Sequence, residues 1–427
     1  MILDDAQPND LPVYMDALAT HAQSAAQALA TATSEKKSAA LLAAATAIQA
    51  RADELLQVNS HEVAAASERG QQASFVDRMQ LSPARIDDIC ESLKKISALP
   101  DPVGQVIREW SVPSGLKFER LRTPIGVIAV IYESRPNVTV DAAALAVKSG
   151  NAVILRGGSE CIETAKILHA AFREGLIAAG LPAYAAQIVE TPDRDAVGLL
   201  LGGLENRIDL VIPRGGKSLV SRIQTEARVP VLSHLDGICH VYLDKDADLE
   251  KAVSITLNSK MRRTGVCGAA ETLLIDRARL HDLLPPVIAA LKEAGCELRG
   301  DHLVLEADNT LTPAIEMDWH TEYLSPILSV AAVDGVVGAI SHIRHYSSGH
   351  TEAIVTENEE TAHQFLTGVD SAIVLHNAST QFADGGEFGM GAEIGIATGR
   401  LHARGPVGLE ELTTYKTVVR GSGHIRP

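Results

Sequence analysis

The feature that most constrains the fold is an alternation of short apolar runs with helical stretches, which begins after Pro124 and continues to about residue 375. The first series of runs covers 127–132, 152–155, 187–189 and 208–212, and the second covers 239–243, 272–275, 327–332, 353–355 and 372–375. Runs of this length between helices are typical of βαβ units, whose strands pair in parallel. A chain of 427 residues is longer than one hydrophobic core usually supports. The two series therefore predict two α/β domains, each with a mostly parallel sheet.

The segments that flank the alternation have other patterns. Residues 14–68 are rich in alanine and carry an apolar stripe at helical spacing, and Ser82-Pro83 is typical of the start of a further helix. Residues 110–122 alternate around Pro113-Ser-Gly115, which indicates a β-hairpin, and residues 411–419 are rich in Thr and Val, as an edge strand would be. The sequence therefore predicts a helical N-terminal part and a small β element in addition to the two domains.

Charge and cysteine content limit the classes of binding partner and the cellular compartments that suit this chain. The chain has 54 acidic against 38 basic residues, a formal net charge of −16, and a field of that sign repels nucleic acid and anionic membranes. The five cysteines are far apart without a Cys-x-x-Cys pair, and His342 and His345 lack a carboxylate ligand set, so we expect neither disulfides nor a metal. Residues 1–12 lack the apolar core of a signal peptide, and no run of about 18 apolar residues occurs. We expect a cytoplasmic protein.

One cysteine lies in a segment that could activate it. Cys267 follows Arg262 and Arg263 in a turn rich in Gly and Thr, and the apolar run 272–275 after it predicts a buried strand. Nearby positive charge, or N–H groups at the start of a helix, would lower the pKa of the thiol and make it a nucleophile. Free cysteines are also often buried and inert, so the local sequence leaves a catalytic and a structural role open.

Two glycine turns follow apolar runs and precede helical stretches. They are Leu155-Arg-Gly-Gly-Ser159 and Val211-Ile-Pro-Arg-Gly-Gly-Lys-Ser218. The second is not a Walker A loop, since Val211 stands five residues before Gly216, and no Gly-x-Gly-x-x-Gly follows an early strand. N–H groups at the start of a helix can bind the phosphates of a cofactor. Glycines that serve only tight turns are the open alternative.

Three further stretches are polar or rich in glycine. Glu133-Ser-Arg-Pro-Asn137 lies at the carboxyl end of a predicted strand, where α/β sheets bind their ligands. Residues 382–391 and 401–408 form glycine-rich loops that are too long for simple turns. In the second loop His402 and Arg404 could hold an anion, although an ordinary solvated loop would look the same.

Several motifs are long enough to compare with known families. They are the cysteine turn with Asn258 before it and Glu271-Thr-Leu-Leu after it, Tyr132-Glu-Ser-Arg-Pro-Asn-Val-Thr139, Val211-Ile-Pro-Arg-Gly-Gly216, His350-Thr-Glu-Ala-Ile354, residues 382–391 and 401–406, and Gly408-Leu-Glu-Glu-Leu-Thr-Thr-Tyr-Lys416. Together they resemble the aldehyde dehydrogenase superfamily, and within it the branch that reduces L-glutamyl 5-phosphate. The resemblance runs from about residue 15 to 420.

The resemblance implies an aldehyde dehydrogenase-like α/β fold. A Rossmann-like NADP(H)-binding domain would comprise residues 1–110 and 126–233, and a catalytic domain residues 234–409. Residues 111–125 and 410–427 would form a small β flap for oligomerisation, so that a homodimer or homotetramer is expected. Transient contact with glutamate 5-kinase, the enzyme of the preceding step, is the protein partner that the resemblance suggests.

The activity that the resemblance implies is the NADPH-dependent reduction of L-glutamyl 5-phosphate to L-glutamate 5-semialdehyde with release of phosphate, in proline biosynthesis. Cys267 would carry the acyl group as a thioester, and the Cys267 N–H and Asn137 would stabilise the oxyanion. The cofactor would contact Arg156, Gly157, Ser159, Arg214, Gly215, Gly216 and Glu322. The anionic groups of the substrate would contact Arg135, Arg263, His402 and Arg404.

Two departures from the wider superfamily bear on the chemistry. Ser233-His-Leu-Asp236 stands where hydrolytic members carry a glutamate base, and a base that activates water would waste the thioester. Met261-Arg-Arg-Thr264 differs from the commoner Thr-Gln-Arg-Pro, which leaves the role of Arg262 open while Arg263 is kept. The alternatives are a coenzyme-A-acylating or hydrolytic aldehyde dehydrogenase and a catalytically silent nucleotide-binding protein on the same fold.

Overall fold

The computed structural model describes residues 10–133 and 135–426. The chain divides into two compact units: unit 1 takes residues 1–233, 390–395 and 407–427, and unit 2 takes residues 234–389 and 396–406. Ser134 of the predicted polar motif lies outside the described residues, as do the first nine residues of the expected cofactor domain and Pro427 of the expected flap.

Unit 1 is built on a four-stranded parallel sheet. Its strands are β3 (Val127–Tyr132), β4 (Ala152–Arg156), β5 (Ala186–Ile188) and β6 (Leu210–Arg214), in the order β5-β4-β3-β6. Every residue of β3 is buried, because helices cover both faces of a parallel sheet and leave neither face to water. This is why the strand is apolar throughout rather than alternating.

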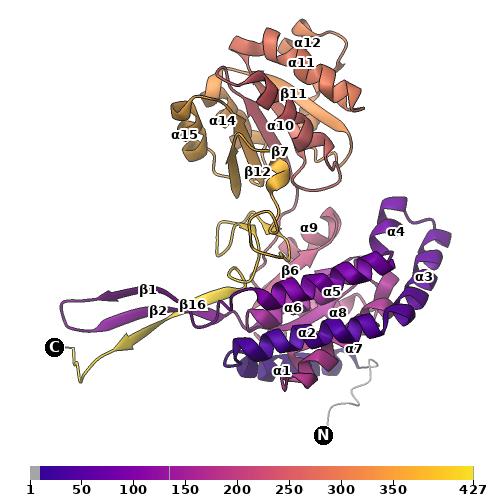
Figure 1. Cartoon of the computed structure of the whole chain (residues 1–427), viewed down its shortest axis with the longest axis vertical. Helices are drawn as coiled ribbons and strands as arrows, with labels where there is room; N and C mark the ends of the chain where they lie inside the picture. Colours follow the sequence, from indigo (N-terminus) through magenta and orange to yellow (C-terminus); the bar gives the residue numbers. More distant parts are fainter. Residues whose placement is uncertain (1–9, 134, 427) are drawn as a thin grey trace. The chain divides into compact units, whose positions relative to one another are not determined.

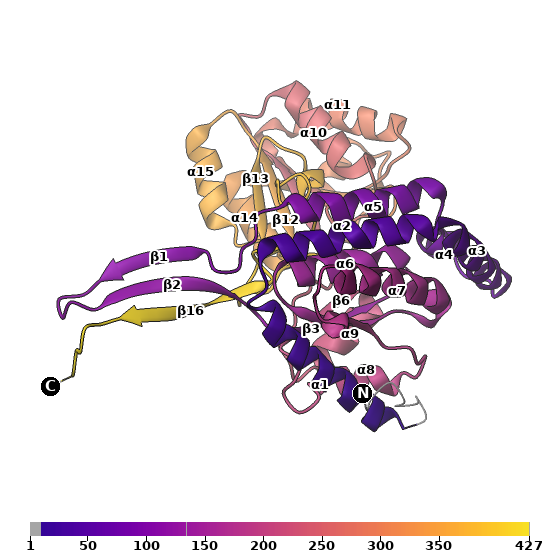
Figure 2. The same ribbon diagram turned by 60° about the horizontal axis from the view of Figure 1, so that its bottom comes forward.

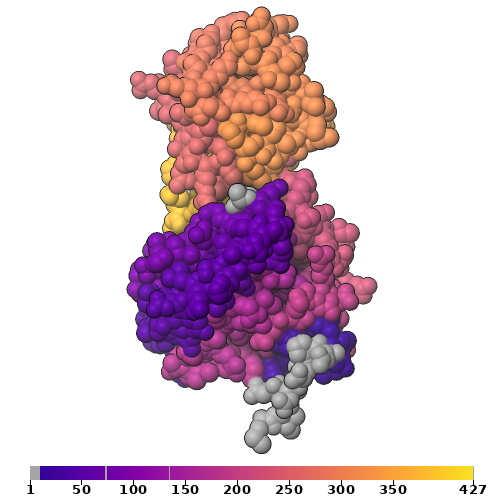
Figure 3. All heavy atoms as spheres, turned by 90° about the vertical axis from the view of Figure 1, so that its right-hand side faces the viewer, coloured from indigo at the N-terminus to yellow at the C-terminus, as the bar shows by residue number. Residues whose placement is uncertain are grey.

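Nine helices of unit 1 fall within the described residues. They are α1 (Leu11–Leu29), α2 (Ser34–Ala50), α3 (Ala52–Glu68), α4 (Ala73–Met79), α5 (Pro83–Ala98), α6 (Pro136–Lys148), α7 (Ile162–Ala178), α8 (Asp195–Leu201) and α9 (Lys217–Glu226). Helix α2 packs against both α5 and α7 (Figure 1), and the N-terminal helices form an outer layer of this unit (Figure 3). Ser82 caps α5 through its hydroxyl, which accepts the Arg85 N–H at 3.2 Å, so the predicted helix start is confirmed.

A three-stranded antiparallel arm extends from unit 1. It consists of β1 (Val106–Ser111), β2 (Lys117–Pro124) and β16 (Thr413–Arg420), with β2 in the centre. Both views of the ribbon show the arm projecting away from the helices and sheet of its own unit (Figure 1, Figure 2). The hairpin and the C-terminal strand that the sequence predicts are therefore parts of one sheet.

Unit 2 contains a seven-stranded parallel sheet in the order β10-β9-β11-β8-β7-β12-β13. Its strands are β7 (Cys239–Leu243), β8 (Ala270–Asp276), β9 (Glu297–Gly300), β10 (Thr312–Pro313), β11 (Ile327–Val333), β12 (Thr351–Val355) and β13 (Ile373–His376). Its helices are α10 (Leu249–Met261), α11 (Leu280–Glu293), α12 (His302–Ala307), α13 (Glu316–Trp319), α14 (Gly335–Tyr346) and α15 (Glu359–Gly368). Two short strands, β14 (Ile396–Ala397) and β15 (Gly405–Pro406), pair with each other. The predicted α/β class with parallel sheets is confirmed.

The core of unit 2 lies on both faces of this sheet. In β7, Val241 and Leu243 pack into the cluster formed with α10, α11 and α12, whereas Tyr242 packs into the opposite cluster with α14 and α15. Successive side chains of a strand point to opposite faces, so neighbouring residues of β7 contribute to the two clusters in turn. None of the helices in the described part of the chain is long and apolar enough to cross a membrane.

Candidate active site

The turn that carries Cys267 lies at the amino edge of the unit 2 sheet. It connects the end of α10 to the start of β8, and Cys267 is partly exposed while the four other cysteines are buried. His350 immediately precedes β12, and Cys239 is the first residue of β7. Because β8, β7 and β12 are parallel neighbours, their amino ends meet at one edge and bring these side chains together.

Close backbone packing fixes the position of the cysteine turn. A Cβ on Gly237 would lie 2.2 Å from the Cys267 carbonyl oxygen, so only glycine fits there. The same carbonyl accepts a hydrogen bond from the Cys239 thiol at 3.1 Å, and burial holds the pKa of that thiol well above its usual range. The Glu322 carboxylate in turn accepts the Gly237 N–H at 3.0 Å. Glu322, predicted from the resemblance as a cofactor contact, is therefore tied through Gly237 to the segment that carries Cys267.

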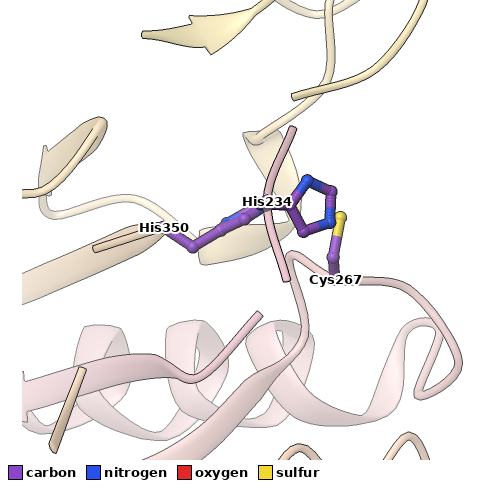
Figure 4. Close-up of side chains that lie close together, drawn as sticks. All are labelled: His234, Cys267 and His350. Carbon is purple, nitrogen blue, oxygen red and sulfur yellow. The ribbon is translucent and has the colours of Figure 1, made fainter. Parts of the chain in front are cut away.

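Two histidines that sequence reasoning gave no role lie beside the thiol. One ligating atom each of His234, Cys267 and His350 lies within 4.8 Å of the other two, and Figure 4 shows the side chains turned toward one another. The His234 Nδ1 donates to the Ile396 carbonyl at 2.7 Å. The His350 Nδ1 lies 2.8 Å from the Thr351 hydroxyl. The two rings meet edge to face with centroids 5.0 Å apart. Cysteine thiolate and imidazole are also the ligands of soft divalent cations.

A buried ion pair spans the two ends of the cysteine turn. Lys260, near the end of α10, lies 2.5 Å from Glu271 in β8, and both side chains are almost completely buried. Burial raises the pKa of the Glu271 carboxyl to about 7, although the charge and hydrogen bond of Lys260 act in the opposite direction. The Leu324 N–H also donates to Glu271, at 3.2 Å. The pair therefore links the helix before the nucleophile turn to the strand after it.

The predicted substrate cations of unit 2 are in different environments. Arg263 is exposed, and its backbone carbonyl accepts a hydrogen bond from Gln381 at 3.2 Å. His402 is also exposed and has a positive φ of 66°. The Arg404 guanidinium forms an ion pair with Asp370 at 2.7 Å, which lowers the pKa of that carboxyl. Arg404 therefore already has an anionic partner, which the sequence did not reveal.

The two glycine turns lie at the carboxyl edge of the unit 1 sheet. Arg156 ends β4 and Arg214 ends β6, while Glu133 follows β3 between them. The Gly216 N–H, at the start of α9, donates to the Glu133 carboxylate at 2.8 Å. A Cβ on Gly215 would lie 2.6 Å from the same carboxylate. The turn thus holds an anionic group against the start of a helix, in a space that a side chain at position 215 would fill.

The other glycine turn of unit 1, which follows β4, is shaped by an arginine and a tyrosine. The Arg156 guanidinium donates to the Gly157 carbonyl at 2.8 Å and to the Pro192 carbonyl at 3.2 Å. Burial lowers the pKa of this guanidinium. A Cβ on Gly157 would lie 3.1 Å from the Tyr132 ring, so the backbone approaches the ring closely. Ser159 begins a short 3-10 helix that leads into α7.

Asn137 and Arg135 lie at the start of α6 in unit 1. Arg135 is the N-cap residue of the helix. The Asn137 amide donates to Asp141 at 2.9 Å, one turn later in the same helix. Burial raises the pKa of the Asp141 carboxyl, while the hydrogen bonds from Asn137 and Ser92 act in the opposite direction. The predicted site residues are therefore divided between the two units, and in unit 2 Glu322 is linked through Gly237 to Cys267, which lies beside His234 and His350.

Comparison with known proteins shows the family of the chain and proteins of the same fold. Residues 12–318 match the model of the aldehyde dehydrogenase family. The chain is 57% identical over 423 residues to the gamma-glutamyl phosphate reductase of Parvibaculum lavamentivorans, covering 99% of this chain and 100% of that one. It is 59% identical over 418 residues to the enzyme of the same name from Brucella suis, covering 98% and 99%. The crystal structure of gamma-glutamyl phosphate reductase from Thermotoga maritima is similar with a TM-score of 0.94 and 44% identity, covering 97% of this chain and all of that one.

Proposed function

This chain belongs to the aldehyde dehydrogenase family, and from that premise we propose that it reduces L-glutamyl 5-phosphate to L-glutamate 5-semialdehyde through a thioester on Cys267. It is an oxidoreductase, and its near-full-length relatives at 57% and 59% identity are gamma-glutamyl phosphate reductases. The observation that carries the mechanism is the single partly exposed cysteine, held at the sheet edge by a glycine that admits no side chain.

The reaction begins on the Cys267 sulfur. The thiolate forms a bond to the acyl carbon of the substrate, and the π electrons of the carbonyl move to its oxygen. When that electron pair returns, the bond to phosphate breaks and a thioester remains on Cys267. The developing oxyanion needs a preorganised donor, and the Cys267 backbone N–H is the first candidate.

The second half of the reaction returns the cysteine to its starting state. When bound, NADPH supplies the hydride that reduces the thioester carbon. The carbon–sulfur bond then breaks, the aldehyde leaves, and the electron pair returns to the Cys267 sulfur. No glutamate occupies the stretch from Ser233 to Asp236, so the base that hydrolytic members of the family use to activate water is absent from it. The thioester is therefore available for reduction by hydride and is not consumed by hydrolysis.

The glycine turns of unit 1 fit the phosphates of a nicotinamide dinucleotide. Gly216 already presents its N–H to a carboxylate, and a pyrophosphate would use the same kind of contact at the start of α9. Gly215, Gly216 and Arg214 would hold the pyrophosphate, and Gly157 and Ser159 the adenosine ribose. Arg156 would favour NADPH over NADH by pairing with the 2′-phosphate.

The remaining substrate and assembly roles stay proposals of the same kind. Arg135, Arg263, His402 and Arg404 would neutralise the carboxylate and phosphate of the substrate, and Asn137 would be a second oxyanion donor. Edge strands β1 and β16 expose apolar side chains at Val106, Ile107, Tyr415 and Val419, which supports a homodimer or homotetramer formed through the arm. A cytoplasmic location and contact with glutamate 5-kinase stay predictions.

The reverse reaction tests the proposal directly. With glutamate semialdehyde as substrate, NADP+ reduction should require inorganic phosphate and should be faster than NAD+ reduction. Turnover that needs coenzyme A instead of phosphate would identify an acylating dehydrogenase, and turnover without either would identify a hydrolytic one. Nucleotide binding without turnover under any of these conditions would identify a silent binding protein.

A further inference from the structure

We propose that Cys267, His234 and His350 form a three-ligand site for Zn²⁺, and that the metal reversibly blocks the nucleophile of the substrate-free enzyme. The expected loss of acylation rests on the proposed function, whereas the metal binding itself does not. No Cys-x-x-Cys or closely spaced Cys and His pattern predicts the site, since its ligands come from three separate segments.

The first argument is the ligand set. Among the described residues, these three are the group of His, Cys, Asp and Glu side chains close enough to share a metal ion. In a tetrahedral Zn²⁺ site with Zn–S of about 2.3 Å and Zn–N of about 2.0–2.1 Å, ligand atoms lie roughly 3.5 Å apart. The present separations are no more than 4.8 Å, so shifts of roughly one ångström would bring the three atoms to one ion.

The second argument is that each imidazole already has the outer contact that a metal-binding histidine needs. Such a histidine usually donates its other ring N–H to a carbonyl or similar acceptor, which fixes the ring and leaves the second nitrogen to the metal. The His234 Nδ1 donates to the Ile396 carbonyl at 2.7 Å, and since a carbonyl only accepts, Nε2 keeps its lone pair. The His350 Nδ1 lies 2.8 Å from the Thr351 hydroxyl, which can accept in the same way.

The third argument is an unsatisfied buried nitrogen. The His350 side chain is completely buried, and its Nε2 has no hydrogen-bond partner in the described part of the chain. A buried polar atom without a partner costs on the order of 1–3 kcal/mol, and such atoms are rare in native proteins. A metal ion bound to Nε2 would remove that cost.

The fourth ligand position stays open. Cys239 is the nearest further thiol, but its S–H donates to the Cys267 carbonyl at 3.1 Å, and the group of side chains close enough to share an ion does not include it. On binding, the Cys267 S–H bond breaks and its proton passes to buffer. The electron pair left on the sulfur forms the Zn–S bond. Because the same electron pair of the Cys267 sulfur would attack the substrate, metal binding and acylation exclude each other.

The test measures binding without substrate. Metal-free full-length enzyme, kept reduced with a phosphine, is titrated with Zn²⁺ by calorimetry and with Co²⁺ by absorption spectroscopy. We expect one metal per chain and a thiolate-to-cobalt charge-transfer band that Cys267→Ser removes. His234→Gln and His350→Gln should each weaken binding by at least the roughly 10–100-fold that loss of an outer contact costs. His363→Gln, on the exposed surface of α15, is the matched control and should bind as the wild type does.

Protection of the thiol provides a readout that needs no variant. Saturating Zn²⁺ should slow alkylation of Cys267 by iodoacetamide at least tenfold, and a chelator should restore both the alkylation rate and the activity. No cobalt charge-transfer band, or alkylation that Zn²⁺ does not slow, would overturn the proposal. Phosphate-dependent NADP+ reduction without such a band would refute only the metal site. A band without any turnover would refute only the proposed function.

Discussion

Gly237 and Cys267 pack backbone against backbone, so that a methyl group at position 237 would lie 2.2 Å from the Cys267 carbonyl oxygen. Gly237→Ala should therefore push the nucleophile turn out of place and lower kcat/KM by about a hundredfold, as displacements near 1 Å can do. Gly265→Ala is the matched variant in the same turn, because a Cβ there meets no atom within 4 Å. This variant should lower kcat/KM far less. Equal losses from the two variants would argue against a positioning role for Gly237.

Replacement of the nucleophile should abolish chemistry and leave the rest intact. Cys267→Ala should lower phosphate-dependent NADP+ reduction by at least about a thousandfold, since no other group can form the thioester. Equilibrium binding of NADP+ should change little. Cys296→Ala is the control, because burial raises the pKa of that thiol to about 11 and keeps it unreactive. Turnover retained by the Cys267 variant would refute the thioester mechanism.

The Glu271 carboxyl should make unit 2 less stable as pH rises. Its pKa is raised from 4.5 to about 7 in the folded state, so between these values the native protein binds more protons than the unfolded chain. Stability then falls with increasing pH, by roughly 3 kcal/mol at most across the window. Hydrogen exchange of the β8 amides in wild type and Glu271→Gln, compared at each pH from 5 to 8, should show this relative loss. Glu293→Gln, on the exposed surface of α11, should track the wild type.

Glu133 should compete with the cofactor for the start of α9. Its carboxylate accepts the Gly216 N–H, where the pyrophosphate is proposed to bind. Glu133→Gln keeps an oxygen acceptor but removes the charge, so the Kd for NADP+ should fall several-fold at low ionic strength, and the gain should shrink with added salt. Glu54→Gln, on an exposed face of α3, controls for net charge. Weaker binding by the Glu133 variant would instead make this carboxylate a cofactor contact.

Arg156 should determine the preference between the two nicotinamide cofactors. Loss of a charge-assisted hydrogen bond to a 2′-phosphate costs about 1.5–3 kcal/mol. Arg156→Gln should therefore lower the ratio of kcat/KM for NADP+ to that for NAD+ by roughly 10–100-fold. Because the guanidinium also donates to the Gly157 and Pro192 carbonyls, a purely structural role would reduce both values together. Arg69→Gln, in the exposed segment after α3, should leave the ratio unchanged.

The parallel sheets could be predicted because their central strands are buried on both faces. The run 127–132 is apolar at every position, and the run 239–243 is apolar except for His240; both are buried along their whole length, as strands between helices are. Strand β9, Glu297–Gly300, cannot be predicted from its own residues because it is short and partly charged, and its place is set by its neighbours β10 and β11. Its existence depends on the sheet around it rather than on its own residues.

The candidate site was only partly predictable for a related reason. The Cys267 turn stands out because glycine and arginine flank a thiol, which is a local pattern. His234 and His350 belong to polar sequence motifs, but their proximity to Cys267 depends on the strand order β8-β7-β12. The pairing of Arg404 with Asp370 is likewise set by tertiary structure. Hydrophobic periodicity reveals the strands but does not reveal which strands are neighbours.

Strand β16 joins β2 only after all of unit 2 has been synthesised, because residues 234–389 and 396–406 lie between the two strands. A ribosome that releases the chain early leaves β2 with an open edge, and open edges are templates for pairing with other chains. Translation therefore finishes the arm last, and a nascent chain without residues 413–420 cannot complete it. Assembly through the arm, as proposed above, would therefore require this last strand.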